Sequence, residues 1–73
     1  MQIKNSKELG QIIKQQRKGL KLTQVDCAGV AGVGVRFLSD LESGKLTCEI
    51  GKTMKILAVL GIHWHVDGIN EAT

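Results

Sequence analysis

The amino-acid sequence predicts an all-α domain of four to five short helices, followed by a β-strand near the C-terminal end of the chain. Apolar residues recur every three or four positions along most of the chain, which is the spacing of a helix face. The chain also lacks proline and contains many lysine, glutamine, leucine and isoleucine residues, which suit helices. Nine glycines are many for a helical protein, and most of them are expected to mark helix ends.

Length and composition indicate one small domain that spans residues 1–73. Its core is small, and dimerisation would help to stabilise it. With one Phe, one Trp and no Tyr, that core must consist of Leu, Ile, Val and Ala. The net charge of +3 suits a polyanionic partner without requiring one. Two cysteines at no metal-ligand spacing favour reduced thiols in a cytoplasmic protein. No apolar run is long enough for a membrane span, and the N-terminus shows no signal segment.

The first helix is expected over residues 6–18. Asn5 or Ser6 can cap its N-terminus, with Glu8 as the capping-box partner of Asn5. Gly19 is expected to stop the helix. Three apolar residues at helical spacing form its buried face: Leu9, Ile12 and Ile13.

Residues 23–30 and 34–42 predict two further short helices joined by a tight turn. Thr23 is a suitable N-cap with Asp26 in the capping-box position, and Gly32 allows a left-handed turn residue. The second of these helices has three residues spaced for burial: Phe37, Leu38 and Leu41. Two short helices joined in this way are the layout of a helix-turn-helix motif over residues 23–42.

A fourth helix is expected after a cap at Thr47 and before a stop at Gly61. Residues 62–66 then alternate apolar and polar side chains, as a strand does. Because a lone strand is unstable in a small helical domain, the simplest arrangement pairs it with the same strand of a second subunit. The expected residues of this dimer interface are Ile62, Trp64 and Val66.

His63 and His65 would point to one face of that strand. Two histidines at this spacing can ligate zinc, but the sequence shows no obvious third or fourth ligand. A strand face exposed at the dimer surface or toward a partner is the more ordinary interpretation. No metal site and no cofactor are therefore expected. The sequence also shows no catalytic arrangement of side chains, so we expect no enzyme activity.

The N-terminal end of the helix at residues 34–42 would enter the major groove of DNA. Arg36 can bond to guanine O6 and N7, Val35 can pack on a thymine methyl group, and Asp40 can accept from cytosine N4 or orient Arg36. A second interpretation makes Arg36 and Asp40 an ordinary surface ion pair one helical turn apart. The expected base contacts are Val35, Arg36, Ser39 and Asp40.

The segment LTQVDCAGVAGVGVRFLSDLESGK at residues 22–45 resembles the LTQ–x–LA–x–GVS–x–x–xIS–x–LE–x–GK pattern of the XRE (Cro and phage-repressor-like) family of DNA-binding proteins. The resemblance covers nearly everything from Ser6 to Val66 and implies a lambda-repressor-like fold. The order of elements along the whole chain is also similar to that of HipB-type antitoxins. That similarity implies an autoregulated toxin–antitoxin operon and a HipA-like kinase as a protein partner.

The resemblance also implies roles for particular residues. Arg17, late in the first helix, and Glu42, of the LE motif, occupy the positions of a buried structural ion pair. Gln24, of the LTQ motif, is expected to hold a phosphate, although a solvated Gln is the simpler alternative. The full set of expected phosphate contacts is Thr23, Gln24, Gly34, Lys45, Thr47 and Lys52.

The sequence departs from the family pattern at three positions. Gly29 and Val35 stand where the family usually has polar or charged residues, and Gly34 stands where it commonly has Ser or Thr. Fewer hydrogen bonds to bases are therefore expected, so that specificity rests on Arg36 and on DNA shape.

Together these features predict a homodimeric, sequence-specific transcriptional repressor that binds double-stranded DNA at a palindromic operator. Its recognition helices would lie about 34 Å apart in successive major grooves. The protein is expected in the bacterial cytoplasm, at the nucleoid when it is bound to its operator. The toxin-neutralising role can coexist with repression. The alternative is a phage-type repressor or restriction controller without a protein partner.

Overall fold

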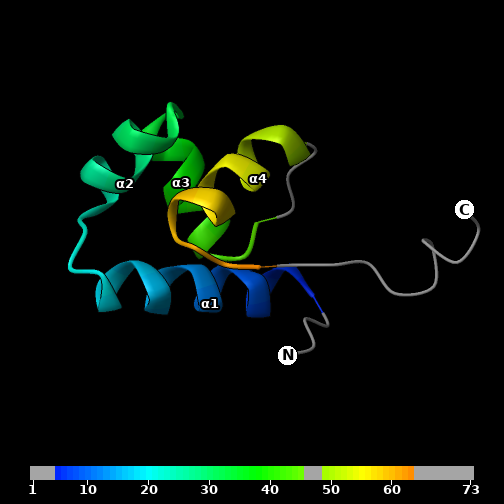
Figure 1. The fold of residues 1–73 in the computed structure, drawn as a ribbon. Helices are drawn as coiled ribbons and strands as arrows, with labels where there is room; N and C mark the ends of the chain where they lie inside the picture. The colour runs from blue at the N-terminus through cyan, green and yellow to red at the C-terminus, as the bar shows by residue number, and fades with distance from the viewer. Residues whose placement is uncertain (1–4, 46–48, 64–73) are drawn as a thin grey trace, which may run out of the picture.

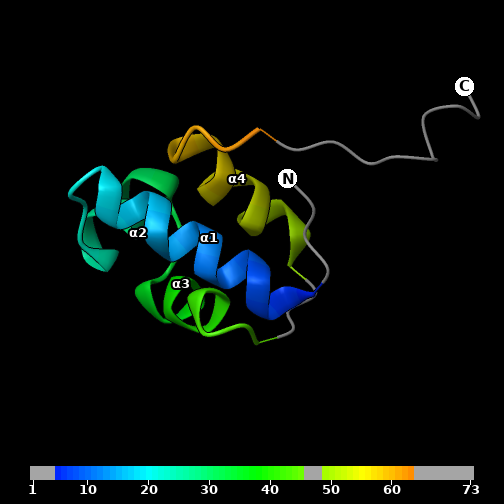
Figure 2. The ribbon, with the colours of Figure 1, turned by 90° about the horizontal axis from the view of Figure 1, so that it is seen from below.

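The computed structural model describes residues 5–45 and 49–63, and the regular elements within these ranges are all α-helices. They are α1 (Ser6–Gly19), α2 (Gln24–Ala31), α3 (Val35–Glu42) and α4 (Ile50–Val59). α1 runs along the bottom of Figure 1 below the other three helices, and in the view of Figure 2 it passes in front of them, between α3 and α4. α3 packs against α1 and α2, and α4 packs against α2. The all-α prediction is confirmed for the described part of the chain.

The core consists of small and aliphatic side chains, as the scarcity of aromatic residues requires. Its buried apolar members come from all four helices and from the residue after α4: Ile13, Cys27, Ala28, Ala31, Leu38, Leu41, Ile56, Leu57 and Leu60. The small side chains of α2 allow its neighbours to approach closely. Gly10 does the same for α1, because a Cβ atom there would lie only 2.5 Å from the carbonyl oxygen of Leu41.

The N-terminal ends of α1 and α2 are capped by the predicted residues. The Asn5 side chain accepts a hydrogen bond from the Glu8 backbone N–H at 2.9 Å, so Asn5, rather than Ser6, is the cap. Thr23 and Asp26 form a reciprocal capping box at the start of α2. These caps satisfy backbone N–H groups that have no partner within the helix.

Left-handed residues end the helices, in one case at an unpredicted position. Gly32 has φ = 73°, as expected for the turn between α2 and α3, and Gly44 ends α3 with φ = 88°. After α1, however, the left-handed residue is Lys21, at φ = 59°. Gly19 is the last residue of α1, so the helix stops there as predicted, and the left-handed residue follows two positions later.

α4 begins later than expected. Its N-cap is Glu49, whose side chain makes no capping hydrogen bond, and the expected cap, Thr47, lies outside the described residues. At the other end, Gly61 adopts φ = 69° as predicted. The Ile62 backbone N–H then donates to the Leu57 carbonyl at 2.9 Å, which closes α4.

The predicted strand at residues 62–66 is only partly within the described chain. Ile62 and His63 are not in a strand, because Ile62 is tied back to the end of α4 and packs partly buried against the core. Trp64, His65 and Val66 lie outside the described residues. Among the described helices, none combines the length and the apolar character that crossing a membrane requires.

Candidate nucleic-acid interface

A buried ion pair fixes the position of α3 against α1. Arg17 Nε donates to Glu42 Oε2 at 2.6 Å and Arg17 Nη2 donates to Glu42 Oε1 at 3.0 Å, a bidentate arrangement. The third donor, Arg17 Nη1, bonds to the Leu22 carbonyl at 2.7 Å. The hydrogen bond to Glu42 raises the pKa of Arg17 above its ordinary value, against the effect of burial. The guanidinium thus joins α1, the α1–α2 turn and α3.

Gln24 is hydrogen-bonded to the carboxylate of this ion pair. Its Nε2 donates to Glu42 Oε1 at 3.1 Å, and the residue is half-buried at the start of α2. The side-chain amide therefore lies on Glu42, which neither of the sequence-based interpretations of Gln24 anticipated. Thr23, next to it, accepts from the Asp26 N–H through its hydroxyl oxygen. The network orders the N-terminal end of α2 beside α3.

α3 presents two different faces. Leu38, Leu41 and Glu42 are buried. The opposite face carries the predicted base contacts: Arg36 has a side chain 89% exposed, Val35 is 40% exposed, and Ser39 is also exposed. Gly34 is the N-cap and supplies no side-chain capping bond, as its lack of a side chain dictates. The N-terminal part of α3 is thus accessible to a large partner.

The fourth predicted base contact, Asp40, lies between two cations. Its Oδ1 is 3.3 Å from Lys45 Nζ, and its Oδ2 is 4.0 Å from Arg36 Nε. The backbone carbonyl of Asp40 accepts from the Lys45 N–H at 3.0 Å and from the Ser43 hydroxyl at 2.8 Å. Lys45, a predicted phosphate contact, is therefore attached to Asp40 through both its backbone and its side chain.

Comparison with known proteins assigns the family. No family model matches the chain. The chain is 48% identical over 59 residues to a Sinorhizobium fredii (strain NBRC 101917 / NGR234) protein named "Uncharacterized HTH-type transcriptional regulator y4mF". The alignment covers 81% of this chain and 78% of that protein. The chain belongs to the HTH-type transcriptional regulators. A solved structure named "MDT Protein" has the same fold, with a TM-score of 0.82 and 20% identity over 94% of this chain and 97% of that one.

Lys52, the other described lysine among the predicted phosphate contacts of this regulator, stands on α4. Its Nζ lies 2.8 Å from Glu49 Oε2 and 5.6 Å from the centre of the Phe37 ring. The ring contact is a cation–π interaction that links α4 to α3. Thr47, between Lys45 and Lys52 in sequence, lies outside the described residues.

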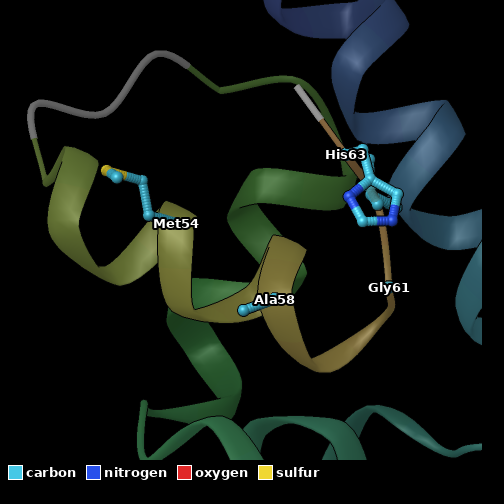
Figure 3. Close-up of a pocket in the computed structure, with 5 residues that line it drawn as sticks. Met54, Ala58, Gly61 and His63 are labelled. Atoms are coloured by element: carbon cyan, nitrogen blue, oxygen red, sulfur yellow. The ribbon is translucent and has the colours of Figure 1, made fainter. Parts of the chain in front are cut away.

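A shallow apolar hollow lies along α4, where the regulator exposes several large side chains. It is lined by Met54, Ala58, Gly61, Ile62 and His63. Figure 3 shows Met54 and Ala58 on α4 and His63 on the chain that follows the helix. Ile50, four residues before Met54, is 70% exposed and extends the apolar surface. In the described ranges, no group of three or more His, Cys, Asp or Glu side chains could hold a metal ion.

Cys27 is a core residue of the regulator. It is fully buried, and burial raises the pKa of its thiol. A protonated, inaccessible thiol packs as a small apolar side chain, so Cys27 contributes to the core by packing.

Proposed function

We propose that this regulator is a repressor of the XRE type that binds double-stranded DNA in a sequence-specific manner through α3. The observation that carries the proposal is the outer face of α3, where Val35, Arg36 and Ser39 are exposed on a helix whose other face is fixed in the core. Arg36 is the side chain with the reach and the donors for a guanine contact. Repression follows because a protein seated on a promoter excludes RNA polymerase.

Phosphate contacts position the regulator on the duplex. Lys45 follows α3 and Lys52 stands on α4, and Thr23, Gln24 and Gly34 would offer groups at the N-terminal ends of α2 and α3. Gln24 would use its backbone N–H here, because its side-chain amide donates to Glu42. Such contacts supply much of the affinity, so binding should weaken steeply as salt rises.

We further propose that the regulator acts as a homodimer on a palindromic operator. The exposed apolar residues of α4, Ile50 and Met54, support this proposal. The hollow beside them includes Ile62, the first residue of the interface predicted from sequence. A second copy is the occupant we assign to this surface, because an apolar patch on a two-fold axis is its own complement. Dimerisation would also enlarge the small core of a 73-residue chain.

The finer role that we propose is that of the antitoxin in a HipA/HipB-type operon, with autoregulation as its transcriptional function. The support is the similarity of the element order to HipB-type antitoxins. In this role the protein partner would be a HipA-like kinase. Affinity purification of the regulator from its native host tests this role, since a co-purifying kinase is expected. Operator binding without any such kinase would favour a phage-type repressor or restriction controller instead.

A gel shift with the DNA directly upstream of the regulator's own gene, repeated over a salt series, tests the DNA-binding function. We expect saturable binding that survives an excess of random-sequence competitor. Binding that the competitor abolishes at every salt concentration would contradict sequence-specific repression.

A further inference from the structure

α3 carries two carboxylates, and only one of them reaches solvent. Glu42 is buried against Arg17 and Gln24, whereas the Asp40 side chain is 36% exposed. The neighbours of Asp40 are Arg36, one helical turn earlier, and Lys45, just beyond the helix. Both cations belong to the surface that we propose for DNA. An acidic side chain at this place requires an explanation, because it repels the phosphates that the cations attract.

The Asp40 carboxylate lies closer to Lys45 than to Arg36. Lys45 Nζ is close, at 3.3 Å from Oδ1, and the Lys45 backbone is also bonded to Asp40. Arg36 Nε is 4.0 Å from Oδ2, at the outer limit of an ion pair, and its side chain is 89% exposed. Asp40 thus neutralises Lys45 locally, while Arg36 keeps the freedom to reach outward.

The carboxylate affects phosphate contacts and base contacts differently. A phosphate that approaches Lys45 or Arg36 must compete with an existing negative charge and is repelled by it. A guanine edge carries acceptors but no net charge, so Arg36 can bond to it while remaining near Asp40. The Asp40 carboxylate should therefore lower the affinity for random-sequence DNA more than it lowers the affinity for a site that offers the correct base.

We propose that Asp40 is a specificity-determining residue of this regulator, one that weakens phosphate binding by Lys45 and Arg36 and so favours base-edge contacts over non-specific attachment. The proposal rests on DNA binding through α3. It differs from the role of Asp40 as a base contact, because the carboxylate acts on DNA of every sequence. The predicted effect on binding to random-sequence DNA can therefore be measured without knowing the operator.

Binding of wild-type, Asp40→Asn and Asp40→Glu proteins to a random-sequence 20-base-pair duplex tests the proposal, by fluorescence anisotropy over a salt series. Asp40→Asn should bind about 3- to 10-fold more tightly near 0.1 M salt, with a salt slope steeper by about one released counterion. Asp40→Glu keeps the charge and should behave as the wild type does. Thermal unfolding confirms that each variant is folded.

The matched control is Glu8→Gln, which removes the same net charge on α1 rather than on α3. With the upstream DNA as a second probe, Asp40→Asn should lower the ratio of specific to random-sequence affinity at least about threefold, and Glu8→Gln should leave this ratio unchanged. Equal effects of the two variants would overturn the proposal, as would an Asp40→Asn protein that binds as the wild type does. A wild-type protein that binds neither duplex would instead contradict the DNA-binding function itself.

Discussion

Arg17 and Glu42, 25 positions apart in sequence, form a bidentate ion pair whose side chains are only 8% and 3% exposed. Two buried charges stabilise a fold only while both are present, because removing one leaves the other without its partner. Glu42→Gln should therefore lower the free energy of unfolding by roughly 2 to 4 kcal/mol, somewhat less than complete removal of the group, since the amide oxygen still accepts.

Urea unfolding followed by circular dichroism measures this loss. The comparison is Glu49→Gln, which removes the carboxylate of the exposed Lys52–Glu49 pair. Exposed pairs contribute little, so this change should cost well under about 1 kcal/mol. Similar small losses for both variants would show that the buried pair does not hold α1 to α3.

Gly10 lets α1 pack directly against the backbone at the end of α3. Gly10→Ala should destabilise the domain by about 1 to 3 kcal/mol, because the new Cβ atom would lie 2.5 Å and 2.6 Å from the carbonyl oxygens of Leu41 and Glu42. Gly29→Ala is the matched change in α2, where a Cβ atom meets nothing within 4 Å. It should stabilise by roughly 0.5 to 1 kcal/mol, since alanine is the better helix former. Thermal unfolding of both variants checks the opposite signs, and a neutral Gly10→Ala would mean that the helices separate easily.

Arg36→Ala should weaken specific DNA binding without affecting the fold. Loss of one bidentate base contact corresponds to about 1 to 3 kcal/mol, or roughly 5- to 150-fold in affinity for the upstream DNA. Because the Arg36 side chain is 89% exposed, the melting temperature should not change measurably. Lys14→Ala, an exposed change on α1 with the same loss of charge, is the control in the gel shift. Equal weakening by both changes would assign Arg36 to general electrostatics rather than to base reading.

Ile50→Lys tests whether a second copy covers α4. Ile50 is 70% exposed, so a lysine should leave the folded monomer intact while placing a charge in the proposed interface. Sedimentation velocity should show a dimer for the wild type and a monomer for the variant. Leu20→Lys, at a 48% exposed apolar position after α1, should remain dimeric. A variant that sediments as the wild type does would exclude this surface from the interface.

Cys27 should make the free energy of unfolding fall as the pH rises into the alkaline range. Because burial raises the pKa of its thiol, the folded state disfavours the thiolate. The stabilisation is complete below the pKa of the unfolded thiol, about 8.5, and is lost as the pH rises through the folded value. The free energy of unfolding should therefore fall between pH 8 and pH 10 more steeply for the wild type than for Cys27→Ala. Parallel pH profiles of the two proteins, both of which retain Cys48, would contradict a perturbed Cys27.

Helix ends are the part of this fold that the sequence predicts best, because capping signals lie within a few residues of one another. Asn5, the Thr23–Asp26 capping box and the left-handed Gly32, Gly44 and Gly61 are of this kind. Lys21 has no such signal, since a lysine at φ = 59° is held there by the surrounding turn rather than by its own preference. The position of the turn after α1 is therefore set by the packing of the helices.

Contacts between helices are less predictable, because they depend on packing across many intervening residues. Family resemblance, not spacing, indicates the pairing of Arg17 with Glu42. The additional bond from Gln24 to Glu42 spans 18 positions and requires the three helices to be placed first. Gly10 likewise looks like an ordinary helix glycine until α3 is seen against it. The exposed face of α3 is an easier case, because helical periodicity alone separates Arg36 and Ser39 from Leu38 and Leu41.

The division of α3 into a buried face and an exposed one affects how the protein can evolve. The helix is held in the domain by its buried side chains, Leu38, Leu41 and Glu42. The exposed side chains contribute little to this packing: Val35, Arg36 and Ser39. Substitutions on the outer face are therefore nearly neutral for folding and are free to accumulate. With DNA bound through α3 as we propose, a lineage that duplicates this gene can acquire a new DNA preference by exchanging a few exposed side chains, while the inherited scaffold stays as it is.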